Sequence, residues 1–445
     1  MKTTHPLDNR ERVLLVGVAL KRAAHGLPGS SVTIGRDSLQ ELEELAISAG
    51  AEISGTMLQI REALDPATLV GKGKLDEIRS EAEARDVPLV IVDHNLTPVQ
   101  LRNMEKGVGR RVIDRTQLIL DIFACHARTR EGHLQVELAQ LNYLLPRLTG
   151  RGENLSRLGG GIGTRGPGEQ KLETDRRRIR DRVAKIQSAI ETVRRQRATR
   201  RTARQAVPLG MVALVGYTNA GKSTLFNALT HADVVTSSKM FATLDPTIRA
   251  VRLPSHRRVL VSDTVGFVRD LPSDLIAAFR ATLEEAQEAA LILQVTDISN
   301  PRNAEQDAEV LKVLSDLGVQ DRPRLHVLNK IDCLGEEEVA ALKKANNHGQ
   351  HTAFVSASTG EGLQELLRRI DEAMPVDPLV RLRLYIPTSD GRSLSLVHAS
   401  GRVLHHAIGN GHFVLDAEIP QSLVRRLDEF TRRPANLDAT AQAPA

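Results

Sequence analysis

Residues 211–224 read MVALVGYTNAGKST, and this stretch decides the fold of the chain. It begins with an apolar run of strand length, passes through a glycine-rich loop and continues into LFNAL, residues 225–229, which suits a helix. All four fixed positions of the pattern G-x-x-x-x-G-K-[ST] are filled, by Gly216, Gly221, Lys222 and Ser223. The order of strand, loop and helix predicts a phosphate-binding loop (P-loop).

Each fixed residue of this loop suits a diphosphate ligand. The two glycines let successive backbone N–H groups point at phosphate, Lys222 can reach the outer phosphates, and the Ser223 hydroxyl can hold Mg²⁺. The alternative is an ordinary glycine turn between a strand and a helix. We favour nucleotide binding because the whole pattern and both flanks are present.

The composition indicates a soluble protein of several domains. The chain has 445 residues, which is too long for one ordinary core, and 41% of them are hydrophobic and 26% charged. The net charge is only +5, so the place where basic residues gather matters more than their excess. Trp is absent and Tyr occurs three times, which leaves few aromatic platforms for stacking on bases.

The cysteines and the N-terminal sequence favour the cytoplasm. Cys125 and Cys333 form neither a disulfide framework nor a thiolate metal site. The first twelve residues are polar, no apolar segment of signal-peptide type follows, and no run is long enough to span a bilayer. We therefore expect a cytoplasmic protein without a membrane span, and a monomer.

Residues 1–115 are predicted to form an α/β domain with a mostly parallel sheet. Apolar runs at 13–19 and 89–93 have strand length, and segments with helical spacing separate them. Within this domain, Gly71-Lys72-Gly73-Lys74 could contact phosphate, or could be a loop that enters a helix starting near Leu75. The residue types leave both readings open.

Residues 116–207 are predicted to form a long helical hairpin. A helical pattern covers 116–148, a glycine-rich loop covers 158–168, and a strongly basic helix runs from Glu169 to about Arg197. The loop contains G-x-G-x-x-G, but no strand precedes it and Pro167 follows, so we reject a dinucleotide site. The arginines could form a solvated helix face. Because acidic residues thin out after Glu191, we favour a polyanionic partner.

The remaining chain is predicted to form two more domains and a tail. Residues 208–373 alternate helices with apolar strands at 211–215, 258–262, 291–296, 325–328 and 353–356, as expected for a P-loop domain. Residues 374–433 should form a small α+β domain, with strands at 381–386 and 393–397 and a helix at 422–430. The tail, 434–445, is expected to be disordered.

Residues that follow the other strands select guanine over adenine. Asp332, in Asn329-Lys330-Ile331-Asp332, can accept two hydrogen bonds from the guanine edge, whereas adenine lacks both donors. In the same motif, Lys330 can cover the base and Asn329 can brace the P-loop. The backbone N–H of Ala357 can bind the guanine oxygen. In an open α/β sheet these strand ends converge on one ligand site.

Two further segments concern the γ-phosphate. Asp263 can fix Mg²⁺ through a water, and the Gly266 N–H should lie near the γ-phosphate. The loop 241–247 could close over the nucleotide through Thr243, with Thr247 as runner-up, or could be an ordinary surface loop. Phe267 stands where many GTPases carry a glutamine that orients water, so we expect slow hydrolysis until a large partner binds.

The predicted site comprises three sets of residues. The catalytic residues are Lys222, Thr243 and Gly266, and the Mg²⁺ ligands are Ser223 and Thr243. The GTP-binding residues are Gly216, Tyr217, Thr218, Asn219, Ala220, Gly221, Lys222, Ser223, Thr224, Phe241, Ala242, Thr243, Leu244, Asp245, Asp263, Thr264, Val265, Gly266, Asn329, Lys330, Asp332, Ser356, Ala357 and Ser358.

With these residues placed, the chain resembles the HflX family of ribosome-associated GTPases over residues 10–375. The resemblance is carried by segments 71–74, 114–124, 135–141, 159–168 and 263–267. It implies an N-terminal α/β domain with a helical hairpin, a Ras-like GTPase domain, and binding to the large (50S) ribosomal subunit and its rRNA in splitting or rescue of ribosomes, protein synthesis or ribosome biogenesis. The departures, His94-Asn95 and Gln170, could alter ribosome contacts but affect no catalytic role.

Two alternatives to this reading differ in what they require. A GTP-gated assembly or scaffold switch would use the same site and would not need the ribosome. ATP hydrolysis at the P-loop is contradicted by Asp332.

Overall fold

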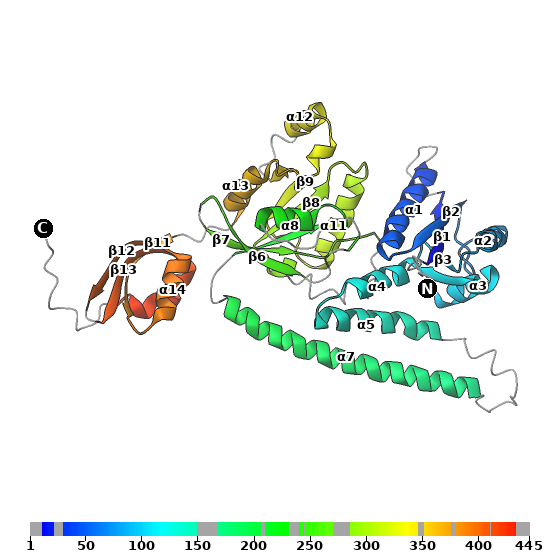
Figure 1. Cartoon of the computed structure of the whole chain (residues 1–445), viewed down its shortest axis with the longest axis horizontal. Coiled ribbons are helices and arrows are strands. Elements are labelled where there is room, and N and C mark those ends of the chain that lie inside the picture. Colours follow the sequence, from blue (N-terminus) through cyan, green and yellow to red (C-terminus); the bar gives the residue numbers. More distant parts are fainter. Residues whose placement is uncertain are drawn as a thin grey trace, which may run out of the picture.

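The computed structural model describes residues 11–21, 30–148, 167–205, 210–230, 240–241, 243, 246–255, 257–269, 285–345, 351–374, 379–409 and 411–432. Three sheets organise these residues (Figure 1). The N-terminal and C-terminal sheets lie on opposite sides of the central one, and the long helix α7 runs along the molecule beside α5 (Figure 1). The predicted α/β class with a small C-terminal α+β domain is confirmed.

The N-terminal sheet is parallel and has the strand order β2-β1-β3-β4. Its elements are β1 (Arg12–Leu20), α1 (Ser30–Ser48), β2 (Glu52–Arg61), α2 (Lys72–Ala84), β3 (Leu89–Val92), α3 (Pro98–Val108) and β4 (Arg111–Asp114). The central strands β1 and β3 are almost wholly buried, which explains their continuous apolar runs. Lys72 begins α2, so the expected start near Leu75 was three residues late and three of the four residues Gly71–Lys74 are helical.

The predicted long helix over 116–148 is wrong in one respect, because it is two α-helices with a break. They are α4 (Arg115–His126) and α5 (Arg130–Leu144), followed by the 3₁₀ turn η1 (Leu145–Leu148). The Thr129 hydroxyl accepts a hydrogen bond from the Gly132 N–H at 2.9 Å and so caps a new helix. The side-chain cap therefore starts a second helix at this position, although the apolar pattern continues through it.

Helix α7 (Pro167–Gln205) is the predicted basic helix, longer at both ends. Its apolar stripe includes the buried Ile186 and Ile190 and packs on α5, as expected for a hairpin. Arg182 joins the two helices through paired hydrogen bonds of 2.7 and 2.8 Å to Glu137. The glycine-rich loop lies outside the described residues up to residue 166.

The central sheet has the strand order β10-β9-β8-β5-β7-β6 and is parallel except for the edge strand β6. Its strands are β5 (Met211–Gly216), β6 (Thr247–Arg252), β7 (Arg258–Asp263), β8 (Leu291–Asp297), β9 (Arg324–Asn329) and β10 (Thr352–Phe354), and its helices and turns are α8 (Lys222–Thr230), α11 (Asn303–Asp316), η2 (Ile331–Cys333), α12 (Glu336–Ala345) and α13 (Leu363–Ala373). All five predicted strands are present. The carboxyl ends of the parallel strands meet at one edge, which is where an open α/β sheet binds its ligand.

The small C-terminal sheet is antiparallel, with the order β11-β13-β12. Its elements are β11 (Leu379–Pro387), α14 (Gly391–Ser400), β12 (Arg402–Gly409), β13 (His412–Pro420), α15 (Gln421–Leu427) and η3 (Asp428–Phe430). The predicted strand at 393–397 is wrong, because these residues are helical. Asp390 caps this helix by accepting from the Ser393 N–H at 3.1 Å, and Val397 is buried against the sheet. The predicted tail lies outside the described residues.

The N-terminal and central sheets share one hydrophobic core. A single buried cluster runs from β1 and α1 through α4 and α5 to Val215 and Val265. The Phe123 ring of α4 meets the Phe241 ring edge to face, with centroids 4.5 Å apart. Among the described residues, no helix is long and apolar enough to cross a membrane.

Candidate nucleotide-binding site

The P-loop joins β5 to α8 at the carboxyl edge of the central sheet. Its two glycines have positive φ angles, 157° at Gly216 and 91° at Gly221. A Cβ atom would lie 2.2 Å from the Val295 carbonyl oxygen at the first and 2.2 Å from Asn329 Nδ2 at the second. Backbone angle and close packing therefore both require glycine here.

Lys222 is buried in the first turn of α8. Its Nζ donates to the carbonyl oxygens of Gly216, at 3.1 Å, and Tyr217, at 2.7 Å. Burial lowers the pKa of Lys222 to about 8, although the Asp263 carboxyl opposes this shift. The charged form of a buried lysine is stabilised when an anion such as phosphate binds beside it.

Three oxygen-bearing side chains converge beside the lysine. Ser223 Oγ and Thr243 Oγ1 lie 2.8 Å apart, and both donate to Asp263 Oδ2, at 2.7 and 2.9 Å. The other oxygen, Asp263 Oδ1, is buried without a hydrogen-bond partner among the described residues. Burial raises the pKa of Asp263, and the hydrogen bond from Ser223 opposes that rise.

This oxygen set fits Mg²⁺. Magnesium takes hard oxygen ligands, keeps several waters and binds through few protein groups. Ser223, Thr243 and Asp263 supply two hydroxyls and one carboxylate within hydrogen-bonding distance of one another, which makes this cluster the candidate. Thr243 lies in it, whereas Thr247 starts β6 in register with Asp263. Ala242, Leu244 and Asp245 lie outside the described residues.

Residues 263–269, which we call the DTVG segment, pack directly on the P-loop. The Thr218 N–H donates to the Phe267 carbonyl at 2.7 Å, and the Phe267 N–H donates to the Gly216 carbonyl at 3.1 Å. A Cβ on Gly266 would lie 2.8 Å from Thr218 Cγ2 and 3.0 Å from Lys222 Nζ. Thr264 and Val265 are buried, and Thr264 Oγ1 donates to the Leu214 carbonyl at 2.6 Å. The Phe267 ring is buried and belongs to the shared core.

The residues predicted to select guanine lie at the ends of β9 and β10. Asn329 Nδ2 donates to the Ala220 carbonyl at 2.9 Å, and its Oδ1 accepts from the Ala357 N–H at 3.0 Å. Asn329 thus ties the P-loop to the Ser356–Ser358 loop. Asp332 is exposed in η2, where its carboxylate can meet a base.

Lys330 has a partner that was not predicted from the sequence. Its Nζ contacts Asp297 Oδ2 at 2.7 Å. Asp297 ends the apolar strand β8 at the carboxyl edge, so its position in the sequence was a usable signal. Tyr217 was predicted only as part of the loop, but its hydroxyl donates to Glu41 Oε1 of α1 at 2.6 Å. Glu41 lies in an amphipathic helix, and nothing in its local pattern marks it.

The strand order, the P-loop and the motif predicted to select guanine are those of a P-loop GTPase domain, and the chain is a GTPase. Three family models match it, described as GTP-binding GTPase N-terminal (residues 36–124), GTP-binding GTPase Middle Region (126–204) and 50S ribosome-binding GTPase (211–330). The chain belongs to the HflX family of GTPases.

The relatives that show this span most of the chain. GTPase HflX of Caldanaerobacter subterraneus subsp. tengcongensis is 46% identical over 88% of this chain and 90% of that protein. GTPase HflX of Escherichia coli is 44% identical over 80% of this chain and 83% of its own length. Among solved structures, a GTP-binding protein from Sulfolobus solfataricus in complex with GDP is 23% identical, with a TM-score of 0.42, covering 82% of this chain and 98% of that one.

Proposed function

We propose that this GTPase binds the large ribosomal subunit and acts in splitting or rescue of ribosomes, protein synthesis or ribosome biogenesis. The observation that carries the proposal is α7, a 39-residue helix rich in exposed arginines, of which Arg178 and Arg180 also pair with Asp175 and Glu173 at 3.7 and 3.6 Å. Arg177, Arg178 and Arg180 are exposed, while the stripe with Ile186 packs on α5. A basic helix of this length suits the phosphate backbone of rRNA. The match of residues 211–330 to a 50S ribosome-binding GTPase model supports the same partner, which would place the protein in the cytoplasm.

In the proposed site, each side chain has one task in GTP hydrolysis. Lys222 contacts the outer phosphates, and the Gly266 N–H donates to the γ-phosphate. Ser223 and Thr243 would hold Mg²⁺, and Asp263 would help to fix it through a water. When bound, Mg²⁺ neutralises charge that develops on the phosphates. Asn329 braces the loop, Lys330 covers the base and Asp332 accepts from guanine.

A single substitution at Asp332 tests guanine selection. Asp332→Asn replaces a carboxylate oxygen with an NH₂ group that faces the guanine donors, so GTP affinity should fall about 100-fold. ATP affinity should stay low in both proteins. Titration of fluorescent GTP and ATP analogues measures both values, and equal GTP binding by the variant would remove Asp332 from the guanine site.

The ribosomal part of the proposal concerns the hydrolysis rate. The buried Phe267 ring cannot hydrogen-bond to the attacking water, so we expect a slow basal rate that rises with 50S subunits. Phosphate release with and without 50S subunits measures this, and a fast rate that ignores them would contradict it. Cosedimentation with 50S subunits in GTP and in GDP separates the alternatives. Binding that does not depend on the nucleotide would favour the ribosome-independent assembly switch.

A further inference from the structure

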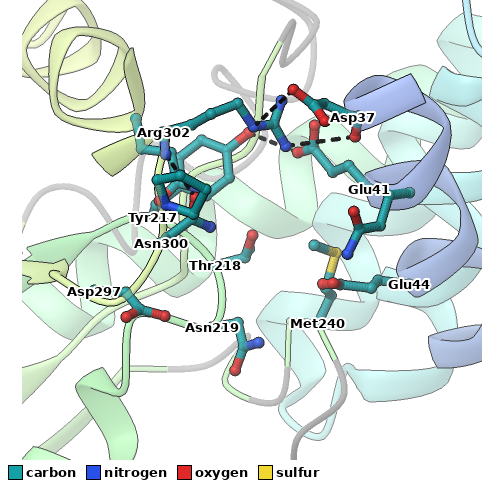
Figure 2. A pocket seen from close by; sticks show the side chains of 13 residues that line it. Asp37, Glu41, Glu44, Tyr217, Thr218, Asn219, Met240, Asp297, Asn300 and Arg302 are labelled. Atoms are coloured by element: carbon teal, nitrogen blue, oxygen red, sulfur yellow. Dashed lines mark hydrogen bonds and ion pairs between the residues drawn. The ribbon is translucent and has the colours of Figure 1, made fainter. Parts of the chain in front are cut away.

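A cavity of about 220 Å³ separates helix α1 from the P-loop (Figure 2). Carboxylates of α1, among them Glu41 and Glu44, line one wall, and Thr218 and Asn219 of the P-loop line the opposite one. Figure 2 shows Glu41, Tyr217 and Arg302 gathered at one end of the cavity. The N-terminal domain therefore forms part of the surroundings of the phosphate-binding loop.

One hydroxyl group joins three segments at this boundary. Tyr217 Oη donates to Glu41 Oε1 of α1 at 2.6 Å and accepts from the Arg269 N–H of the DTVG segment at 2.8 Å. Tyr217 itself belongs to the P-loop. Behind it, Glu41 pairs with Arg115 at 3.1 Å, and Arg115 pairs with Asp93 at 2.7 Å; all three charged side chains are at most 6% exposed. The Tyr217 hydroxyl is thus held by a buried carboxylate, Glu41, which is itself paired with a buried arginine.

The N-terminal domain also contacts the segment before Thr243. The Met240 N–H donates to Ser48 Oγ at the end of α1, at 2.8 Å. Next to it, Phe241 packs edge to face on Phe123 of α4. The P-loop, the DTVG segment and residues 240–241 are therefore all attached to the same domain. Each of them lies beside groups that we assign to the γ-phosphate and its metal.

We propose that Tyr217 is a positioning residue, whose hydroxyl couples the N-terminal domain to the nucleotide by holding α1 and the DTVG segment in an arrangement that favours GDP over GTP. The inference rests on the proposed GTP site and adds its regulation. In this arrangement the Thr218 N–H is engaged by the Phe267 carbonyl, and Lys222 by two loop carbonyls. A γ-phosphate that draws Gly266 and Lys222 to itself must disturb these contacts.

Charge acts in the same direction. The γ-phosphate adds negative charge beside a cavity wall that already carries Glu41 and Glu44, and like charges in a partly buried space repel. Two nearby cations are already paired, since Arg302 lies 3.7 Å from Asp37 and Lys330 lies 2.7 Å from Asp297, and they offset the charge of Glu44 only in part. Burial raises the pKa of Glu44 and the neighbouring Glu41 raises it further, and these effects outweigh the opposing influence of Lys330 and Arg302. The cavity therefore tolerates added negative charge poorly.

Tyr217→Phe tests the tether in the full-length protein. We expect the ratio of GTP affinity to GDP affinity to rise about three- to tenfold, the scale of one ordinary hydrogen bond. Titration with fluorescent GTP and GDP analogues measures the ratio without ribosomes. Tyr143→Phe is the matched control, because Tyr143 is equally buried, 7% against 6% exposed, and lies in α5 away from the P-loop. Its ratio should stay at the wild-type value.

Glu44→Gln tests the charge independently of the tether. It should raise GTP affinity more than GDP affinity, and the difference should shrink at high salt. An unchanged ratio in folded Tyr217→Phe protein, or an equal change in the Tyr143→Phe control, would overturn the inference. These outcomes leave the proposed function intact as long as GTP binds. Failure of wild-type protein to bind either nucleotide would instead remove the proposed site and the inference with it.

Discussion

At the scale of single residues, the site depends on charges buried before any ligand arrives. Lys222 and Asp263 share the interior beside the P-loop, and burial disfavours the charged form of each. The lysine retains its proton at neutral pH because its pKa, about 8, still lies above 7. Phosphate binding stabilises that proton further, so nucleotide affinity and lysine protonation are linked.

This linkage predicts a pH dependence with a definite sign. Below about pH 8 Lys222 is protonated, so GTP affinity should not change on its account. Above that value the free protein loses the proton that the complex needs, and GTP affinity should fall, approaching tenfold per pH unit. Calorimetric titration between neutral pH and pH 9.5 would measure it. Lys222→Met should bind weakly and lose this dependence, whereas an identical slope in that variant would assign the effect to another group.

At the scale of elements, helix α13 is fastened to the turn between β6 and β7 by one carboxylate. Asp371 accepts from the Ser255 N–H and Oγ, both at 2.7 Å, and from Arg257 Nη2 at 2.5 Å. Burial alone would raise the pKa of Asp371, but hydrogen bonds from Ser255 and Arg257 outweigh it and lower the pKa. The carboxylate form therefore stabilises the folded state.

Removing this contact should destabilise the GTPase domain. Asp371→Ala leaves a half-buried arginine without its carboxylate and should lower the free energy of unfolding by about 2 kcal/mol. The contribution is present above the pKa of an unfolded aspartate and disappears as pH falls through the lower folded value, so wild type and variant should converge in acid. Urea unfolding at neutral and acid pH measures this. Glu372→Gln removes an exposed pair on the same helix and should cost under about 1 kcal/mol. A cost as large as that of Asp371→Ala would contradict the argument.

The secondary-structure elements differ in how well the sequence predicts them. Strands buried on both faces, such as β5 and β8, are continuous apolar runs in the sequence and were predicted. The half-exposed strand β2 has no such run and was missed. Residues 393–397 alternate like a strand, yet the Asp390 cap and packing of Val397 make them helical. The local sequence pattern therefore identifies the buried central strands, whereas helix caps and tertiary packing decide the secondary structure of the more exposed segments.

At the scale of the whole molecule, motifs predicted the nucleotide site because its residues follow consecutive strands of one sheet. The contacts of Tyr217 with Glu41 could not be predicted in this way, because they join residues 176 positions apart through the docking of two sheets. The shared hydrophobic core around α4 fixes that docking. Under the proposed function, the long helix α7 beside this core is the place from which a ribosomal partner would act on the GTPase domain.

The exposed arginines of α7 should, under the proposed function, set ribosome affinity without setting nucleotide affinity. Replacing Arg177 and Arg178 with Gln removes two exposed charges and should weaken 50S binding about tenfold, with a salt slope smaller by about two. GTP affinity of the free protein should not change. The matched control replaces Arg425 and Arg426 of α15 with Gln, which alters net charge equally in the C-terminal domain. Cosedimentation with 50S subunits across a salt series measures both. Equal losses in the two variants would show that net charge, and not α7, attracts the ribosome.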